Sequence, residues 1–249
     1  MKTVSVWERG GYRYIQGVFQ YSGGVAAEAG FAIERVRFRR PVSLAEGFES
    51  AERYLASIGR PLDAFCACEL RSPAPFTEEG FRAFNEAYVG TLERWGIFRE
   101  GVNPVARTNV CPAGAPPVDV VMYAFSYTVP SGGPNPSFII AGSGEAREGG
   151  ASYRESIVAL DDPSIEGLRQ KVRFVMDEME DRMRALGVGW DDVLSTQVYT
   201  VRDIGPLLSD AFVNRGAVSG GLEWHFSRPP VEHLEFEMDV RAPSGDRYL

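Results

Sequence analysis

The sequence predicts an α+β fold made of two similar halves, each a mixed β-sheet with two helices packed on one face. A Pro/Gly-rich segment at residues 130–136, near the midpoint of the 249-residue chain, is typical of a linker. Short motifs recur in the same order on its two sides, which indicates an internal repeat. We therefore expect one domain over residues 1–130, a linker over 131–136 and a second domain over 137–249.

The repeat consists of five pairs of short matching segments. With the first-half member given first, they are 19–23 and 138–142, 55–59 and 183–187, 62–63 and 190–191, 84–89 and 208–213, and 116–119 and 229–232. Each match is weak alone, but five in a conserved order favour two copies of one structural unit.

The first half contains two expected helices with a strand between them. The first helix carries an apolar stripe at steps of three and four that ends at Gly59, formed by Phe48, Ala51, Leu55 and Ile58. A strand is expected over 63–70, and a second helix over 77–95 with Phe81, Phe84, Tyr88 and Trp95 on one face. Two further strands complete this half.

The second half repeats this order. Its long helix is expected to begin after Asp162, a candidate N-cap residue, with Pro163 at the first helical position. The apolar stripe of this helix runs from Ile165 to Leu186, and Gly187 ends it. A strand over 192–200, a short helix over 203–214 and two closing strands follow.

Composition excludes several classes of function. Lys and Arg total 26 and Asp and Glu total 34, so the formal charge is −8, which argues against nucleic acid as the main partner. The chain has no run of 18 apolar residues, so no transmembrane helix is expected, and its N-terminus lacks the apolar core of a signal peptide. Three cysteines fit a reduced, cytoplasmic protein.

Several segments together resemble a known family. They are FQYSGG at 19–24, ASIGRPLDAF at 56–65, FRAFNEAY at 81–88, ARTNV at 106–110 and ALGVGWDDVLSTQVYTVRD at 185–203. In this order the chain resembles two tandem members of the Rid/YjgF superfamily, the reactive-intermediate (enamine/imine) deaminases. The resemblance implies a cofactor-independent hydrolase and a homotrimer with clefts between subunits.

The resemblance also implies roles for individual residues. Arg107, in ARTNV, matches the arginine that holds the substrate carboxylate, and a guanidinium suits this role because it grips a carboxylate with two hydrogen bonds. Asn85 and Ser22 match an asparagine and a Ser-Gly turn of the family cleft. Glu237 matches a glutamate that orients the hydrolytic water. The register of this match is open, and Glu235 on the same strand is the alternative.

The two halves differ at these positions. Arg107 corresponds to Gly220, whereas the first-half strand that corresponds to the Glu237 strand has no carboxylate. An arginine in one copy and a carboxylate in the other predict one composite site where the two halves meet. A plain alternative stays open for each residue: an ion-paired surface arginine, and a solvated strand face with Glu235 and Asp239 beside Glu237.

Four further residues are candidates for the same cleft. Thr108 and Asn109 follow Arg107 and can add hydrogen bonds, and Cys111 shares strand parity with Arg107. His225 is placed near the cleft strand by its distance from the Pro-Pro-Val landmark, as a general acid or base or as a packed structural histidine. Two histidines without matching acidic or cysteine spacing predict no metal site.

These observations predict hydrolytic deamination of a small enamine or imine acid, such as a 2-aminomuconate-like or 2-imino acid, with release of ammonia. Arg107 would anchor the carboxylate, and a water positioned by Glu237 or by backbone carbonyls would attack the C=N carbon. No cofactor is expected, because a C=N bond is already electrophilic. Two alternatives remain: a chorismatase-like hydrolase of a cyclic carboxylate, and a non-catalytic protein that binds small acids.

Overall fold

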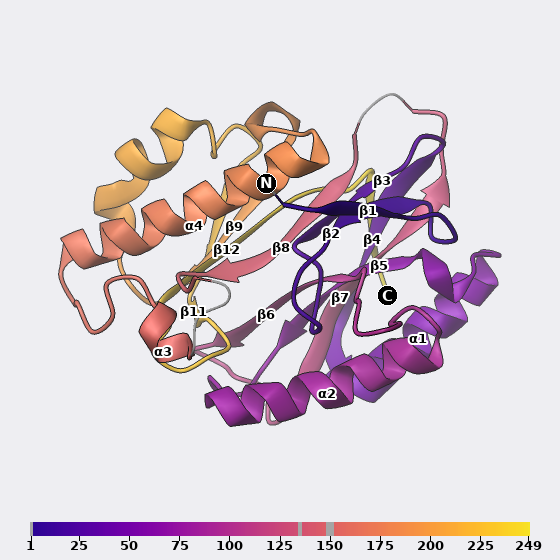
Figure 1. The fold of residues 1–249 in the computed structure, drawn as a ribbon, viewed down its shortest axis with the longest axis horizontal. Helices are drawn as coiled ribbons and strands as arrows, with labels where there is room; N and C mark the ends of the chain where they lie inside the picture. Colours follow the sequence, from indigo (N-terminus) through magenta and orange to yellow (C-terminus); the bar gives the residue numbers. More distant parts are fainter. Residues whose placement is uncertain (1, 134–135, 148–151) are drawn as a thin grey trace.

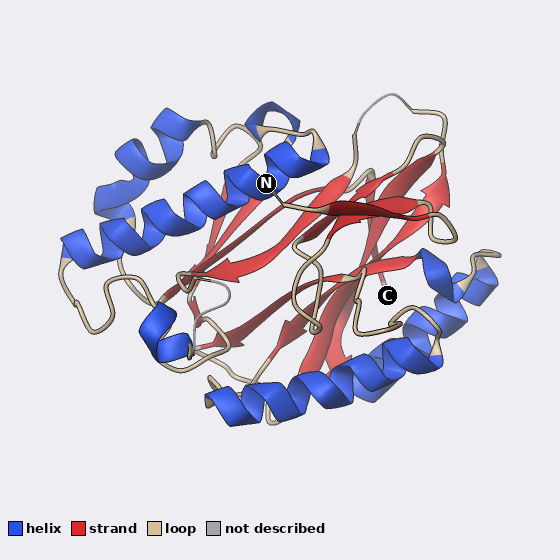
Figure 2. Ribbon diagram, in the orientation of Figure 1, coloured by secondary structure: helices blue, strands red, loops and turns tan. Residues whose placement is uncertain are grey.

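The computed structural model describes residues 2–133, 136–147 and 152–249. Two β-sheets lie against each other in the middle of the molecule, and the long helices cover their outer faces (Figure 1). Figure 2 shows the same arrangement, with the strands inside and the helices outside. The described chain therefore has an α+β architecture in which the inner faces of two sheets meet.

The seven-stranded sheet has the order β1-β2-β3-β8-β12-β9-β10. Its strands in chain order are β1 (Val4–Trp7), β2 (Tyr12–Ile15), β3 (Gly24–Ala27), β8 (Phe138–Gly144), β9 (Ser195–Thr200), β10 (Leu222–His225) and β12 (Phe236–Ala242). The six-stranded sheet has the order β11-β6-β5-β7-β4-β13. Its strands are β4 (Phe31–Ser43), β5 (Phe65–Arg71), β6 (Ala106–Pro112), β7 (Val121–Pro130), β11 (Ser227–Arg228) and β13 (Gly245–Tyr248).

The two halves of the chain exchange strands, so the expected arrangement of tandem domains, each with its own sheet, is wrong. The N-terminal strands β1 to β3 extend the sheet of the second half, where Gly24 in β3 pairs with Ile140 in β8. At the C-terminus, β13 pairs in parallel with β4, with Asp246 opposite Arg35. The chain passes between sheets from β7 to β8 across the expected linker, in which residues 134–135 lie outside the described residues.

The three long helices form near their predicted positions. They are α1 (Leu44–Ser57), α2 (Glu78–Arg94) and α4 (Ile165–Leu186). The N-cap of α4 is Ser164, whose hydroxyl accepts from the amide of Gly167, and not the expected Asp162. Gly187 ends this helix in the left-handed conformation, with φ of 76°.

Two smaller helical segments complete the fold. The short helix expected over 203–214 is a series of 3₁₀ and π turns with Pro206 in its first turn. A four-residue helix, α3 (Tyr153–Ser156), precedes α4. No helix among the described residues is long and apolar enough to cross a membrane.

Apolar packing and a buried ion network hold the two sheets together. Each sheet packs its outer face against helices, and residues of both sheets, Ile33 and Ile139 among them, form an apolar cluster between the inner faces. Within this interface, Glu69 of β5 pairs with Arg35 at 2.6 Å and with Arg241 of β12 at 2.5 Å. Arg241 also pairs with Asp239, so opposite charges of the two sheets neutralise one another within this interface.

Candidate active site

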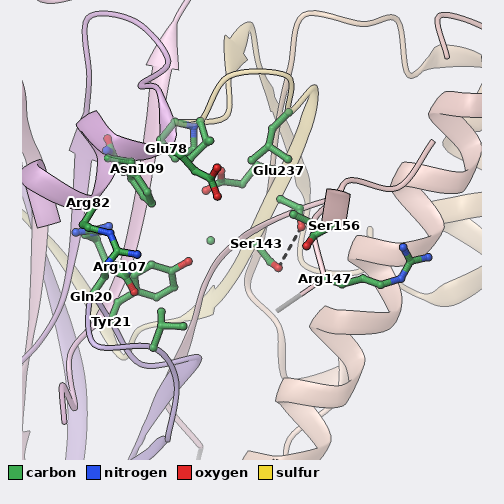
Figure 3. Close-up of a pocket in the computed structure, with 18 of the residues that line it drawn as sticks. Gln20, Tyr21, Glu78, Arg82, Arg107, Asn109, Ser143, Arg147, Ser156 and Glu237 are labelled. Carbon is green, nitrogen blue, oxygen red and sulfur yellow. Dashed lines mark hydrogen bonds between the residues drawn. The ribbon is translucent and has the colours of Figure 1, made fainter. Parts of the chain in front are cut away.

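A cleft with a volume of about 320 Å³ lies where the two sheets meet (Figure 3). The six-stranded side contributes Arg107 and Asn109 from β6, with Glu78 and Arg82 from α2. The seven-stranded side contributes the segment Gly142–Gly144 of β8, and Glu237 of β12. Because residues of both halves line it, the cleft has the composite character that the sequence predicts.

Arg107 is a buried cation without a protein counter-ion among the described residues. Arg107 is 3% exposed, and its Nη1 has no hydrogen-bond partner within the part of the chain that the structure describes. Four aromatic rings surround its guanidinium carbon at 4.6 to 5.7 Å from their centroids, namely Tyr21, Phe81, Phe84 and Tyr88. Burial of an unpaired charge is costly, so this site favours a bound anion.

Glu237 is the buried carboxyl of the opposite wall. Glu237 is 4% exposed. A Cβ added at Gly142 would overlap Glu237 Oε1, so the absence of a side chain at this position of β8 leaves space for the carboxyl. Burial, with the negative charges of Asp239 and Glu145 nearby, holds the pKa of Glu237 well above the ordinary carboxyl range, against an opposing effect of Arg107. Glu237 therefore keeps its proton at pH values where an exposed glutamate is ionised.

Asn109 adds a directed donor. Its Oδ1 accepts a hydrogen bond from Ser72 at 2.9 Å, which fixes the orientation of the amide, and its Nδ2 has no partner among the described residues. Because Asn109 lines the cleft, this amide nitrogen is available to a ligand oxygen.

Three of the predicted site residues, Arg107, Asn109 and Glu237, line one cleft. Two others lie outside its lining. Ser22 is fully buried, and its hydroxyl lies 3.5 Å from the carbonyl of Gly24. Asn85 is fully buried in α2, and neither amide atom has a partner among the described residues. Neither residue belongs to the lining of the cleft.

The remaining predicted residues, Thr108, Cys111 and His225, are also absent from the lining of the cleft. Thr108 packs against β8, where its Cγ2 would lie 3.1 Å from a Cβ added at Gly142. Burial raises the pKa of Cys111 to about 12, so its thiol is a poor nucleophile. His225 stacks on Tyr199 at the sheet edge, with ring centroids 4.9 Å apart. Burial and Arg71 lower the pKa of His225, which favours its neutral form.

Sequence reasoning missed several residues of the cleft. Tyr21 and Gly142 lie in the repeated segments 19–23 and 138–142, but nothing in these motifs shows that one covers Arg107 and the other makes room for Glu237. Ser143 and Arg182 also line the cleft. Arg182 lies in the long helix of the second half, for which the sequence predicted only the apolar face. Among the described residues, no group of three or more His, Cys, Asp and Glu side chains is placed to hold a metal ion.

Comparison with known proteins gives three findings. Residues 4–247 match the model of the family described as 2-aminomuconate deaminase CnbZ. The chain is 58% identical over 251 residues to the 2-amino-5-chloromuconate deaminase of Comamonas testosteroni, and the match covers 100% of both chains. Its structure is similar to that of a chorismatase, with a TM-score of 0.53 and 13% identity over 91% of this chain and 78% of the other.

These findings correct the predicted family and fold class. The match is to the CnbZ model and not to the Rid/YjgF superfamily, and the two-sheet fold is similar to that of chorismatase. Two of the segments that carried the Rid resemblance, 56–65 and 185–203, each span a helix end, a glycine and the start of the next strand, an arrangement that is common in α+β proteins. At 13% identity, the likeness to chorismatase concerns the fold alone.

Proposed function

The chain belongs to the CnbZ family of 2-aminomuconate deaminases, and we propose that its substrate is a 2-aminomuconate-like enamine whose carboxylate Arg107 binds. Membership confirms the predicted enzyme class, a deaminase of a small enamine or imine acid. The identity of the substrate and the roles of the cleft residues are the proposal developed below.

The observation that carries this proposal is the buried guanidinium of Arg107, which has no counter-ion among the residues that the structure describes. A substrate carboxylate would supply the missing counter-charge and accept from Nη1, and Asn109 Nδ2 would donate to the same ligand. The four rings around Arg107 exclude water and strengthen this attraction.

Glu237 has the protonation state that the first chemical step needs. An enamine becomes electrophilic when one of its carbon atoms is protonated, because its nitrogen lone pair then forms a C=N⁺ bond. The buried Glu237 carboxyl, whose pKa is raised, donates this proton and becomes a carboxylate. Arg107 lowers the pKa of Glu237, so it favours the carboxylate once it has formed.

Hydrolysis then follows with the same group as base and acid. The Glu237 carboxylate takes a proton from a water molecule as the water oxygen bonds to the iminium carbon, which gives a carbinolamine. Glu237 returns this proton to the nitrogen, the C–N bond breaks, and the hydroxyl of the intermediate becomes a ketone as its proton passes back to Glu237. The sum is enamine plus water giving keto acid plus ammonia.

The test compares Arg107→Ala, Arg107→Lys and Glu237→Gln with wild type on a freshly generated enamine acid. Loss of a buried bidentate pair costs about 2–4 kcal/mol, or roughly 30- to 1000-fold in kcat/KM. Lys restores part of the activity, because a point charge keeps the attraction and loses the fork. Glu237→Gln lowers kcat. A folded Arg107→Ala variant with wild-type kcat/KM would show that Arg107 is not the anchor.

The state of assembly is a separate prediction. The homotrimer was implied by the Rid resemblance, which is now replaced, so it requires its own measurement. Light scattering at micromolar concentration tests it, because a trimer has three times the 27.4 kDa mass of the chain.

A further inference from the structure

We propose that Glu145 and Lys171, a buried ion pair outside the lining of the cleft, position the Glu237 carboxyl by fixing the first residues of β12. This inference rests on the proposed function, in which Glu237 is the proton donor. Both residues of the pair are fully buried, with Lys171 Nζ 3.2 Å from Glu145 Oε1. Such a pair adds little net stability compared with apolar side chains of similar volume, so its presence points to a role in orienting the chain.

Glu145 continues the pairing between β8 and β12 beyond the end of β8. Gly144, the last residue of β8, pairs with Glu237. Glu145 follows it, and its carboxylate accepts from the amide of Glu235 at 2.7 Å and from the amide of Phe236 at 3.0 Å. Hydrogen bonds from backbone amides to a charged carboxylate are stronger than those to a carbonyl. The two residues that precede Glu237 are therefore fixed in position.

Lys171 of α4 holds the Glu145 carboxylate in this orientation. Its ammonium donates to Glu145 Oε1 at 3.2 Å and to the carbonyl of Val158 at 3.0 Å, and it lies 3.5 Å from Glu235 Oε2. An ammonium has three donors, which match these three oxygens. The only other lysine in the sequence is Lys2, whereas arginine is abundant. A compact ammonium suits three oxygens in a closed site better than a planar guanidinium does.

Glu235 belongs to this support and not to the cleft. The lining includes Glu237 and does not include Glu235, the alternative that the sequence left open. Glu235 Oε1 pairs with Arg202 at 2.6 Å, and the Glu235 carbonyl accepts from the Thr200 hydroxyl at 2.7 Å. With the ion pair, these contacts tie the start of β12 to α4, β8 and β9.

Glu145 acts on Glu237 through its charge as well as through the backbone. Burial raises the pKa of Glu145, but Lys171 and two backbone amides favour its charged form. Burial is also the largest cause of the raised pKa of Glu237, and the charges of Asp239 and Glu145 raise it further. Removal of the Glu145 charge should therefore lower the pKa of Glu237.

The other groups around Glu237 are not changed by such a substitution. Arg107 of β6 and Arg71 of β5 oppose the rise in its pKa. Cys111 of β6 and Tyr199 of β9 are neutral neighbours, because burial raises the pKa of each. Three more charged side chains line the cleft from α2 and α4, namely Glu78, Arg82 and Arg182. A shift in the pH profile can therefore be assigned to the substituted residue.

The test measures kcat, KM and the pH dependence of kcat for wild type, Glu145→Gln and the double variant Glu145→Gln/Lys171→Met on a freshly generated enamine acid. We expect Glu145→Gln to lower kcat by about 10- to 100-fold and to change KM by less than about 2-fold, because Arg107 still binds the carboxylate. The alkaline fall in kcat should begin at lower pH than in wild type. The double variant leaves no unpaired charge in the buried site, so it should fold and show both changes.

Glu180→Gln is the matched control. Glu180 lies on α4 and pairs with Arg215 at 2.7 Å, but it is not part of the cleft lining, so kcat and its pH dependence should stay those of wild type. The inference is overturned if a folded Glu145→Gln variant keeps the wild-type kcat, if kcat falls without a change in the pH profile, or if Glu180→Gln loses as much activity. In each of these cases a low kcat of Glu237→Gln would leave the proposed function standing. Wild-type kcat in Glu237→Gln would overturn both proposals.

Discussion

Replacement of Gly142 by Ala tests whether the position of the Glu237 carboxyl controls catalysis. Gly142 lies on β8, where a Cβ would overlap Glu237 Oε1 and would lie 3.1 Å from Thr108 Cγ2. The overlap is well inside the 3.0 Å that Cβ contacts respect. The carboxyl is at the end of a side chain, so it moves more easily than the backbone of the two strands.

The expected effect follows from this geometry. To reach a normal contact distance, the carboxyl must shift by about 1 Å, and a misplacement of this size in a reacting group costs on the order of 100-fold in rate. We therefore expect Gly142→Ala to lower kcat/KM for the enamine acid by about 100-fold, mainly through kcat. The carboxylate anchor at Arg107 is unchanged, so KM should change little.

The assay is ammonia release from a freshly generated enamine acid, with circular dichroism and thermal unfolding to confirm the fold. Gly144→Ala is the matched control, because it lies on the same strand and lines the same cleft. Its added Cβ would meet the end of the Leu234 side chain at 3.1 Å, not Glu237. A folded Gly142→Ala variant with the activity of Gly144→Ala would refute the role assigned to Glu237.

Three further predictions concern charge. Because Glu237 must be protonated to start the reaction, kcat/KM should fall as pH rises through its raised pKa, and a flat alkaline limb would contradict this. The second prediction concerns stability. Because the pKa of Glu237 is higher in the folded chain than in the unfolded chain, the folded chain keeps this proton over a range of pH in which the unfolded chain has lost it. Within that range, the unfolding free energy of wild type should fall by up to about 1.4 kcal/mol per pH unit relative to Glu237→Gln, as measured by urea unfolding at several pH values. The third prediction is that Glu69→Gln lowers the unfolding free energy by about 3–5 kcal/mol, because Arg35 and Arg241 lose the carboxylate that they share. A decrease of less than about 1 kcal/mol would show that this network does not hold the two sheets together.

The sequence alone predicted much of the local structure. Helices α1, α2 and α4 lie near their apolar stripes, because an amphipathic period depends on neighbours three and four residues away. The comparison of the two halves also predicted one site with Arg107 and Glu237, and both line one cleft, although the tandem domains assumed in that comparison do not form. These inferences needed only residue type, spacing and the repeat.

Tertiary structure decided which strands share a sheet and which side chains face the cleft. β1 to β3 join the second half and β13 joins the first, because strand edges offer the same backbone groups to any partner and nothing local selects among them. The same non-local choice turns Ser22 and Asn85 inward, places His225 at a sheet edge and brings Gly142 against Glu237. The sequence therefore predicted which residues were candidates for the site. Their arrangement across two sheets depends on contacts between distant segments, which no single segment of the sequence determines.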